Sequence, residues 1–233
     1  MINITSRMHE ILRQLNRWAD VWPLLLPLFV YLVYRVKEKS ITPLIIYVII
    51  TFPVSLLATI MALYHYKMPD YLQNNNVLMN FQSFARTVLF GWYILNLRQV
   101  KQYPFAKFLF YLYIVLVPVN FIFFETPLFS SVRLFSAESI ILFILCITFF
   151  LSSILDEEED ITLKHPAFLI CTGISIYEAI SFLASLFLYP LFYTNPKFGY
   201  LTTKISAYSF ILLCILMSIA IYQSKKQAAD PVH

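Results

Sequence analysis

The sequence has 233 residues, of which 60% are hydrophobic and 13% are charged, and its formal net charge is +4. Soluble domains carry about 25% charged residues, so this composition and a mean hydropathy of +0.71 exclude an ordinary soluble domain. The apolar residues stand at consecutive positions, without the alternation of membrane β-strands. We therefore expect an all-α, polytopic membrane protein, because helices and closed barrels are the structures that satisfy their backbone in lipid.

Residues 1–17 are expected to form an amphipathic helix in the membrane interface. Hydrophobic side chains recur there at helical spacing, and three arginines lie outside that stripe. This pattern is typical of interfacial helices. The alternative is that these residues are the first turns of the first span. No apolar segment precedes a small-residue cleavage site, so we do not expect a signal peptide.

Seven apolar segments follow, and a bilayer core takes roughly 20 helical residues to cross. Thr42 is expected as an N-cap with Pro43 at the first helical position, and Pro53 and Pro118 are expected to bend their helices. No linker interrupts the pattern, so residues 1–233 are expected to form one seven-transmembrane-helix bundle with a short cytoplasmic tail at 223–233. The expected spans are 18–34, 43–64, 77–97, 105–124, 134–155, 166–188 and 200–222.

The orientation is expected from the short loops, because cytoplasmic loops are rich in lysine and arginine. We expect the C-terminus in the cytoplasm and the N-terminus outside, although the three arginines of residues 1–17 then lie on the outer side. The basic residues on the predicted cytoplasmic side are Arg35, Lys37, Lys39, Arg98, Lys101, Lys107, Lys164, Lys225 and Lys226.

Four ionisable residues lie inside the expected spans, where such residues normally face a bundle interior or a water-filled cavity. Arg86 is near the middle of the third span, and Glu178 is expected at a comparable depth on the sixth. Glu138 and Lys204 are nearer the outer ends of the fifth and seventh spans, where long side chains can reach water. Two acids and two bases are therefore expected in the outer half of the bundle.

Two interpretations of these charges remain open. The first is an outward-facing polar cavity that binds a small polar or amphipathic ligand. The second is a structural ion pair between Arg86 and Glu178 that fixes the helix register. Neighbouring polar residues on the same helix faces complete the candidate ligand-binding set, which is Arg86, Glu178, Glu138, Lys204, Asn80, Ser83 and Ser175.

Enzymatic, metal-binding and cofactor-binding patterns are absent from the sequence. The four histidines lie outside the middle of any expected span, whereas a catalytic zinc needs about three protein ligands. No serine stands in a G-x-S-x-G setting, and the three glycines form no phosphate-binding loop. We therefore expect no enzyme, no cofactor and no nucleic-acid partner. The acidic run 156–160 is either a solvated loop or a docking patch for a basic partner.

A further pattern covers about a third of the chain. It consists of Asn120, then Arg133 and Glu138 in RLFSAESIILF, then LKHPAF, then Gly173 and Tyr177 in GISIY. This pattern resembles a functionally uncharacterised family of small seven-span integral membrane proteins of Bacteroidota. The resemblance implies a bacterial inner (cytoplasmic) membrane protein that works beside a separate sensor histidine kinase.

Two functions are therefore expected as alternatives. The first is a receptor-like sensor or signalling subunit, in which a ligand in the outer cavity changes the cytoplasmic loops. The second is a small-solute transporter or channel, for which the prolines in the first, second and fourth spans are typical of broken helices.

Overall fold

The computed structural model describes residues 14–36, 38–69, 74–126, 128, 131–155, 165–188 and 195–229. Every regular element in these ranges is a helix, so the all-α prediction is confirmed. Most of the predicted residues 1–17 and the whole acidic run 156–160 lie outside the described residues. The elements in chain order are η1 Trp22–Leu24, α2 Leu25–Tyr34, η2 Lys39–Ile41, α3 Thr42–Tyr64, η3 His65–Lys67, α4 Asn76–Asn96, α5 Arg98–Lys101, α6 Pro104–Phe123, α7 Val132–Leu155, α8 Pro166–Leu183, the π-helix η5 Ala184–Leu188 and α10 Pro196–Ala229.

Proline residues mark the beginning of several helices, because a fixed φ and a missing N–H suit the first turn. Pro104, Pro166 and Pro196 each begin a long helix.

The prediction for the start of α3 is wrong in detail: Ile41 is the N-cap and Thr42 is already the first helical residue. The helix α10 continues through much of the expected tail 223–233, as far as Ala229.

Five helices within the described residues are long and apolar enough to cross a membrane, so the predicted seven-span count is not confirmed. The apolar helical segment Trp22–Tyr34 is short, and at 1.5 Å per residue it reaches about 20 Å of the roughly 30 Å core. The helix α4 is long enough, but polar residues such as Asn80, Gln82 and Arg86 lower its hydropathy.

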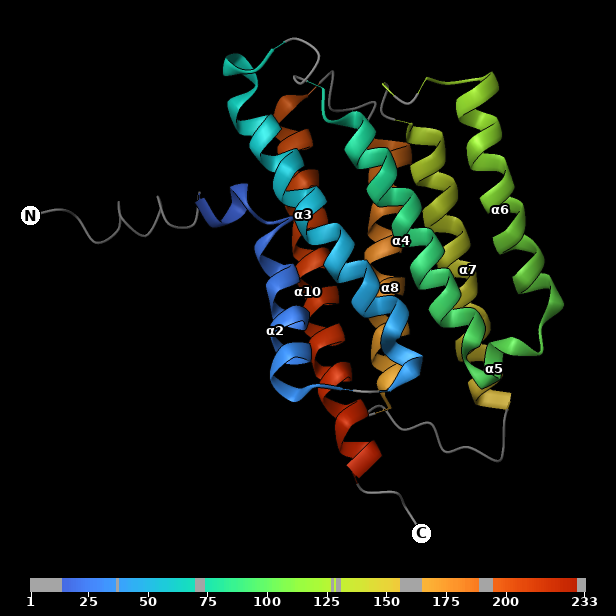
Figure 1. Ribbon diagram of the computed structural model, residues 1–233. Coiled ribbons are helices and arrows are strands. Elements are labelled where there is room, and N and C mark those ends of the chain that lie inside the picture. Colours follow the sequence, from blue (N-terminus) through green and yellow to red (C-terminus); the bar gives the residue numbers. More distant parts are fainter. Residues whose placement is uncertain are drawn as a thin grey trace, which may run out of the picture.

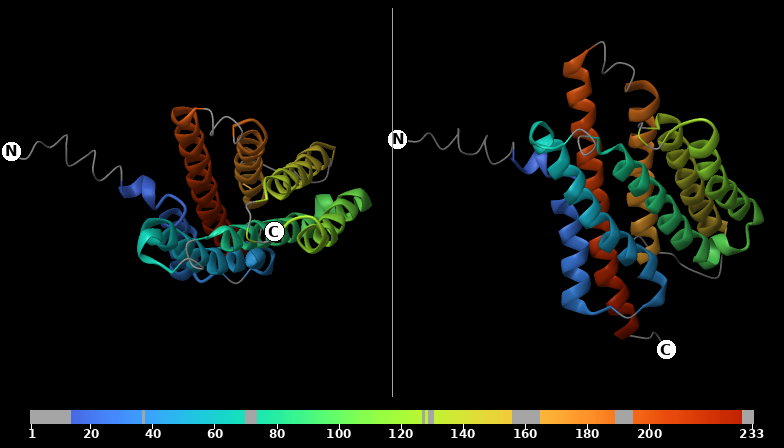
Figure 2. Two further views of the ribbon diagram at one scale, coloured as in Figure 1. Left: turned by 90° about the horizontal axis from the view of Figure 1, so that it is seen from above. Right: turned by 45° about the horizontal axis from the view of Figure 1, so that its top comes forward.

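Five long helices and the shorter α2 pack around a common interior. Along this ring α2 contacts α3, α3 contacts α4, α4 contacts α7, α7 contacts α8, α8 contacts α10, and α10 returns to α2. Figure 1 shows α3 and α4 in front of α8 and α10, and the view from above in Figure 2 separates the two layers. The helix α6 packs outside the ring against α7 and α4. Residues on the inner faces of all six ring helices can therefore meet.

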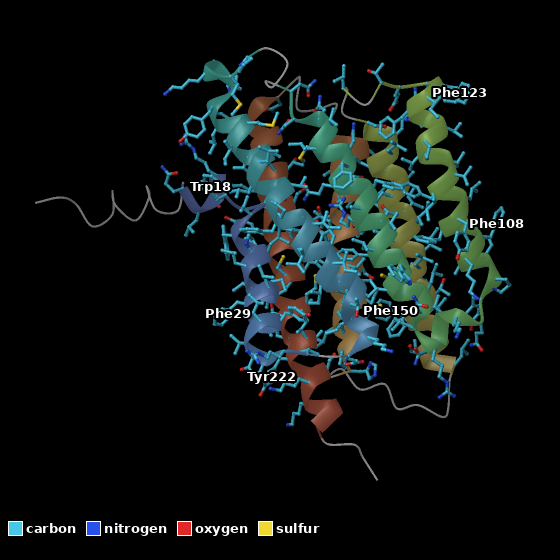
Figure 3. The ribbon with its side chains drawn as sticks, viewed as in Figure 1. Trp18, Phe29, Phe108, Phe123, Phe150 and Tyr222 are labelled. Atoms are coloured by element: carbon cyan, nitrogen blue, oxygen red, sulfur yellow. The ribbon has the colours of Figure 1, made fainter. Side chains whose placement is uncertain are left out.

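The outer surface of the bundle is strongly apolar. Phe29 on α2 and Phe108 and Phe123 on α6 each expose more than half of their surface, and Figure 3 shows them on the outer faces of their helices. Isolated exposed apolar residues are normal on a soluble protein, but a continuous apolar surface marks an interaction site. Together with the five apolar helices, this surface fits contact with a lipid bilayer.

Candidate functional site

The centre of the bundle holds an ion pair between Arg86 of α4 and Glu138 of α7. The Nε atom of Arg86 lies 2.6 Å from Oε1 of Glu138. The other carboxylate oxygen, Oε2, accepts a hydrogen bond from the Ser83 hydroxyl one turn earlier on α4. Glu138 is 0% exposed and Arg86 is 9% exposed. Both oxygens of this buried carboxylate are therefore paired, as burial of a charge requires.

Glu178 of α8 lies near the same nitrogen of the guanidinium. Its Oε1 atom is 3.4 Å from Nε of Arg86, and its Oε2 atom accepts a 2.8 Å hydrogen bond from Ser139 of α7. The predicted contact between Arg86 and Glu178 is thus present, but Glu138 is the closer partner. We call Arg86, Glu138 and Glu178 the buried charge cluster.

Tyr177 of α8 completes the surroundings of the guanidinium. Nη1 of Arg86 donates a 2.7 Å hydrogen bond to the Tyr177 hydroxyl, and the guanidinium carbon lies 4.9 Å from the centre of the tyrosine ring. A cation over an aromatic face is attracted by the ring quadrupole. A guanidinium has five N–H donors, and these contacts to Glu138 and Tyr177 use two of them.

A cavity of about 260 Å³ lies next to the buried charge cluster. Its wall includes three members of the network described above, Ser83, Arg86 and Tyr177, while the two glutamates lie behind this wall. The rest of the lining comes from the end of α3, the start of α4, α10 and the segment before η1: Arg17, Asp20, Ser55, Ala58, Thr59, Ala62, Leu63, Asn75, Met79, Gln82 and Phe210. A volume just below the usual 300–1,000 Å³ range suits a small solute.

Arg17 and Asp20 give the cavity one charge of each sign in addition to Arg86. Both side chains keep an exposed surface. They therefore lie where the cavity meets its surroundings, and Arg86 lies at its inner wall.

The predicted site residues separate into two groups. Arg86, Glu138, Glu178 and Ser83 form one network of hydrogen bonds and ion pairs. The other three predicted residues, Asn80, Ser175 and Lys204, do not line the cavity. Asn80 is buried on α4, Ser175 donates to the Cys171 carbonyl of its own helix, and Lys204 is half-buried on α10.

Several residues of the site were missed by the sequence analysis. Tyr177 directly precedes Glu178 and was noted only as part of the family pattern. Ser55, Asp20 and Gln82 line the cavity but follow no motif. A polar residue on an otherwise apolar helix, such as Ser55 on α3, is the pattern that would have pointed to them.

Within the described part of the chain, no group of three or more histidine, cysteine, aspartate or glutamate side chains is placed to hold a metal ion. Comparison with protein-family models, with curated proteins and with solved structures found no match. The function must therefore be argued from the cavity and the charges themselves.

Proposed function

We propose that this protein is a receptor-like membrane protein that binds a small polar or amphipathic ligand in the cavity beside Arg86. The observation that supports the proposal is a cavity in which a buried arginine, already held in place by Glu138 and Tyr177, lines the wall. A guanidinium that is already held in position can donate hydrogen bonds to an anionic or carbonyl group of a ligand without moving its side chain. The apolar part of the wall, for example Met79 and Phe210, suits the remainder of an amphipathic molecule.

A closed interior on the far side of the cluster favours a receptor over a channel. Below the cluster, the ring helices fill the centre with buried apolar side chains that include Phe90, Leu145, Phe149, Ile170 and Leu213. A second hollow, near Arg98 and Ser152, lies beyond this layer at the opposite end of the bundle. Close-packed interiors leave few voids larger than a water molecule, so this layer separates the two hollows.

The proposed orientation places the cavity outside and the C-terminus in the cytoplasm of a bacterial inner membrane, with α2 and α4 as additional spans. The cavity lies at the end of the bundle where α3 ends and α4 begins. The opposite end carries a dense set of basic residues, as cytoplasmic ends do: Arg35, Lys39, Arg98, Lys101, Lys107, Lys225 and Lys226. A separate histidine kinase remains the proposed partner there.

Thermal unfolding of the full chain in lipid nanodiscs tests the proposal. Tryptophan fluorescence would be followed in the presence of small carboxylates, zwitterionic amino acids and phosphate monoesters. A ligand that binds only the folded protein stabilises it by about 2.7 kcal/mol at a hundred times its dissociation constant. We expect one of these classes to raise the midpoint temperature of the wild-type protein in a saturable way.

Two cavity variants and one control make the result specific. Ala58→Leu fills the cavity from α3, and Gln82→Leu removes a polar group from its wall. Leu57→Ala changes the neighbouring outward-facing residue and serves as the control. The proposal predicts that the ligand no longer raises the midpoint temperature of either cavity variant, whereas it still raises that of the control. Absence of any ligand-dependent rise in the wild type, or an equal rise in all three variants, would contradict it. Net uptake of the ligand into proteoliposomes would instead favour the transporter alternative.

A further inference from the structure

The buried charge cluster has an excess of negative charge when all its members are ionised. It contains two carboxylates, Glu138 and Glu178, both 0% exposed, and one guanidinium. The charged groups acting on Glu178 within the described residues are Arg86 and Glu138. The cavity lining adds one basic and one acidic residue, Arg17 and Asp20, and therefore no net formal charge. An uncompensated buried charge is expensive, so the cluster requires one further positive charge.

Both glutamates pair electrostatically with Arg86, and the hydrogen bonds indicate which of them has a carboxylate oxygen without a donor. Both oxygens of Glu138 accept hydrogen bonds, from Arg86 and from Ser83. Glu178 accepts one at Oε2 from Ser139, but among the described residues its buried Oε1 has no hydrogen-bond donor. Buried polar atoms without a partner are uncommon and require an explanation. The Oε1 atom of Glu178 is therefore the place where an additional proton fits.

A second observation shows that the space beside the cluster is suited to water. Thr51 and Ser55, one turn apart on α3, are each 1% exposed, and neither hydroxyl has a partner among the described residues. Other serines and threonines in this bundle, for example Thr148 and Ser218, donate to the carbonyl four residues earlier. Ser55 lines the cavity. Ordered water normally satisfies such buried groups, and water there would connect the cavity with Arg86.

We propose that the buried charge cluster is a proton-binding site, in which Glu178 carries one exchangeable proton delivered through the cavity. A hydronium ion in the cavity transfers its proton to the Glu178 carboxylate and becomes water, and the reverse step releases it. The carboxyl group then adds no negative charge, and Arg86 and Glu138 form a balanced pair. This inference does not depend on which solute occupies the cavity.

Within the described residues, the titratable groups around the buried charge cluster come from α3, α4, α6, α7, α8 and α10, and Arg86 is the cation among them. The phenols of Tyr47, Tyr113 and Tyr177 and the thiol of Cys214 stay neutral when buried. Glu138 and Asp20 are carboxyl groups and add only negative charge, so none of these groups provides the missing positive charge.

Infrared difference spectroscopy of the full chain in nanodiscs, titrated between about pH 5 and pH 9 without added ligand, tests the inference. We expect the wild-type protein to show the carbonyl band of a buried protonated carboxyl at neutral pH, and to lose it as the pH rises. Glu178→Gln should abolish the band. Glu138→Gln should abolish the band as well. Glu178 is then the one carboxylate left in the cluster, and Arg86 balances its charge, so Glu178 stays ionised. The control Glu38→Gln, at an exposed acidic residue, should keep it.

The outcome that overturns the inference needs no variant. If the wild-type protein shows no protonated carboxyl anywhere in this pH range, the cluster does not hold a proton. A band that persists in both Gln variants would also refute it, since the proton would then reside elsewhere. Because no ligand is added, failure here is distinct from failure of the proposed ligand binding.

Discussion

Replacing Arg86 with methionine is the most informative single perturbation of this bundle. The substitution keeps an extended apolar side chain but removes the group that lies 2.6 Å from Glu138 and 3.4 Å from Glu178. Removing one partner of a buried ion pair typically costs about 3–5 kcal/mol, because the other charge is left unpaired. The free energy of unfolding of a protein is about 5–15 kcal/mol in total. We therefore expect Arg86→Met to remove a large part of the free energy of unfolding.

The cost can be measured by denaturant titration in mixed micelles, followed by tryptophan fluorescence. Arg133→Met is the matched control, because Arg133 has an 82% exposed side chain that lies 3.9 Å from Glu125. An exposed ion pair with a separation this long contributes at most about 1 kcal/mol to the free energy of unfolding. If Arg86→Met is no more destabilising than Arg133→Met, the buried cluster does not have the energetic role inferred from the structure.

Double variants identify the true partner of the guanidinium. Adding Glu138→Gln to Arg86→Met removes the carboxylate that Arg86 balances, so most of the lost stability should return. Adding Glu178→Gln leaves Glu138 buried without its cation, so little should return. A larger recovery with Glu178→Gln would show that Glu178, rather than Glu138, is the ionised partner.

The remaining predictions concern packing. A Cβ atom at Gly91 would overlap the Phe110 ring, whereas one at Gly173 would lie 3.1 Å from a terminal methyl group. Gly91→Ala should therefore cost about 1–3 kcal/mol, more than Gly173→Ala, in the same denaturant titration. Phe149→Ala should cost about 3–5 kcal/mol because the side chain is fully buried, whereas Ile154→Ala on the outer surface should cost less than 1 kcal/mol. Maleimide should label the three cysteines only after unfolding, and fast labelling of the native protein would contradict the buried positions of Cys146, Cys171 and Cys214.

The helices themselves were predictable because they depend on local information. Long consecutive apolar segments and prolines at helix starts are read directly from the chain. For example, the expected span 166–188 corresponds to α8 and the π-turn that follows it. The seven-span prediction was not confirmed because the segment Trp22–Tyr34 is short and because α4 has one polar face. A hydropathy average cannot distinguish a polar helix outside a membrane from one whose polar face is covered by other helices.

The sequence by itself also determined that Arg86, Glu138 and Glu178 need partners, because the cost of an unpaired charge in an apolar environment is independent of the fold. Only the tertiary structure decided that Glu138 is the closer partner, that Tyr177 holds the guanidinium, and that Lys204 does not line the cavity. The physical reason is that partner choice depends on helix rotation and neighbour order around the ring. Periodicity fixes which residues share a face of one helix, but not which face of another helix lies opposite.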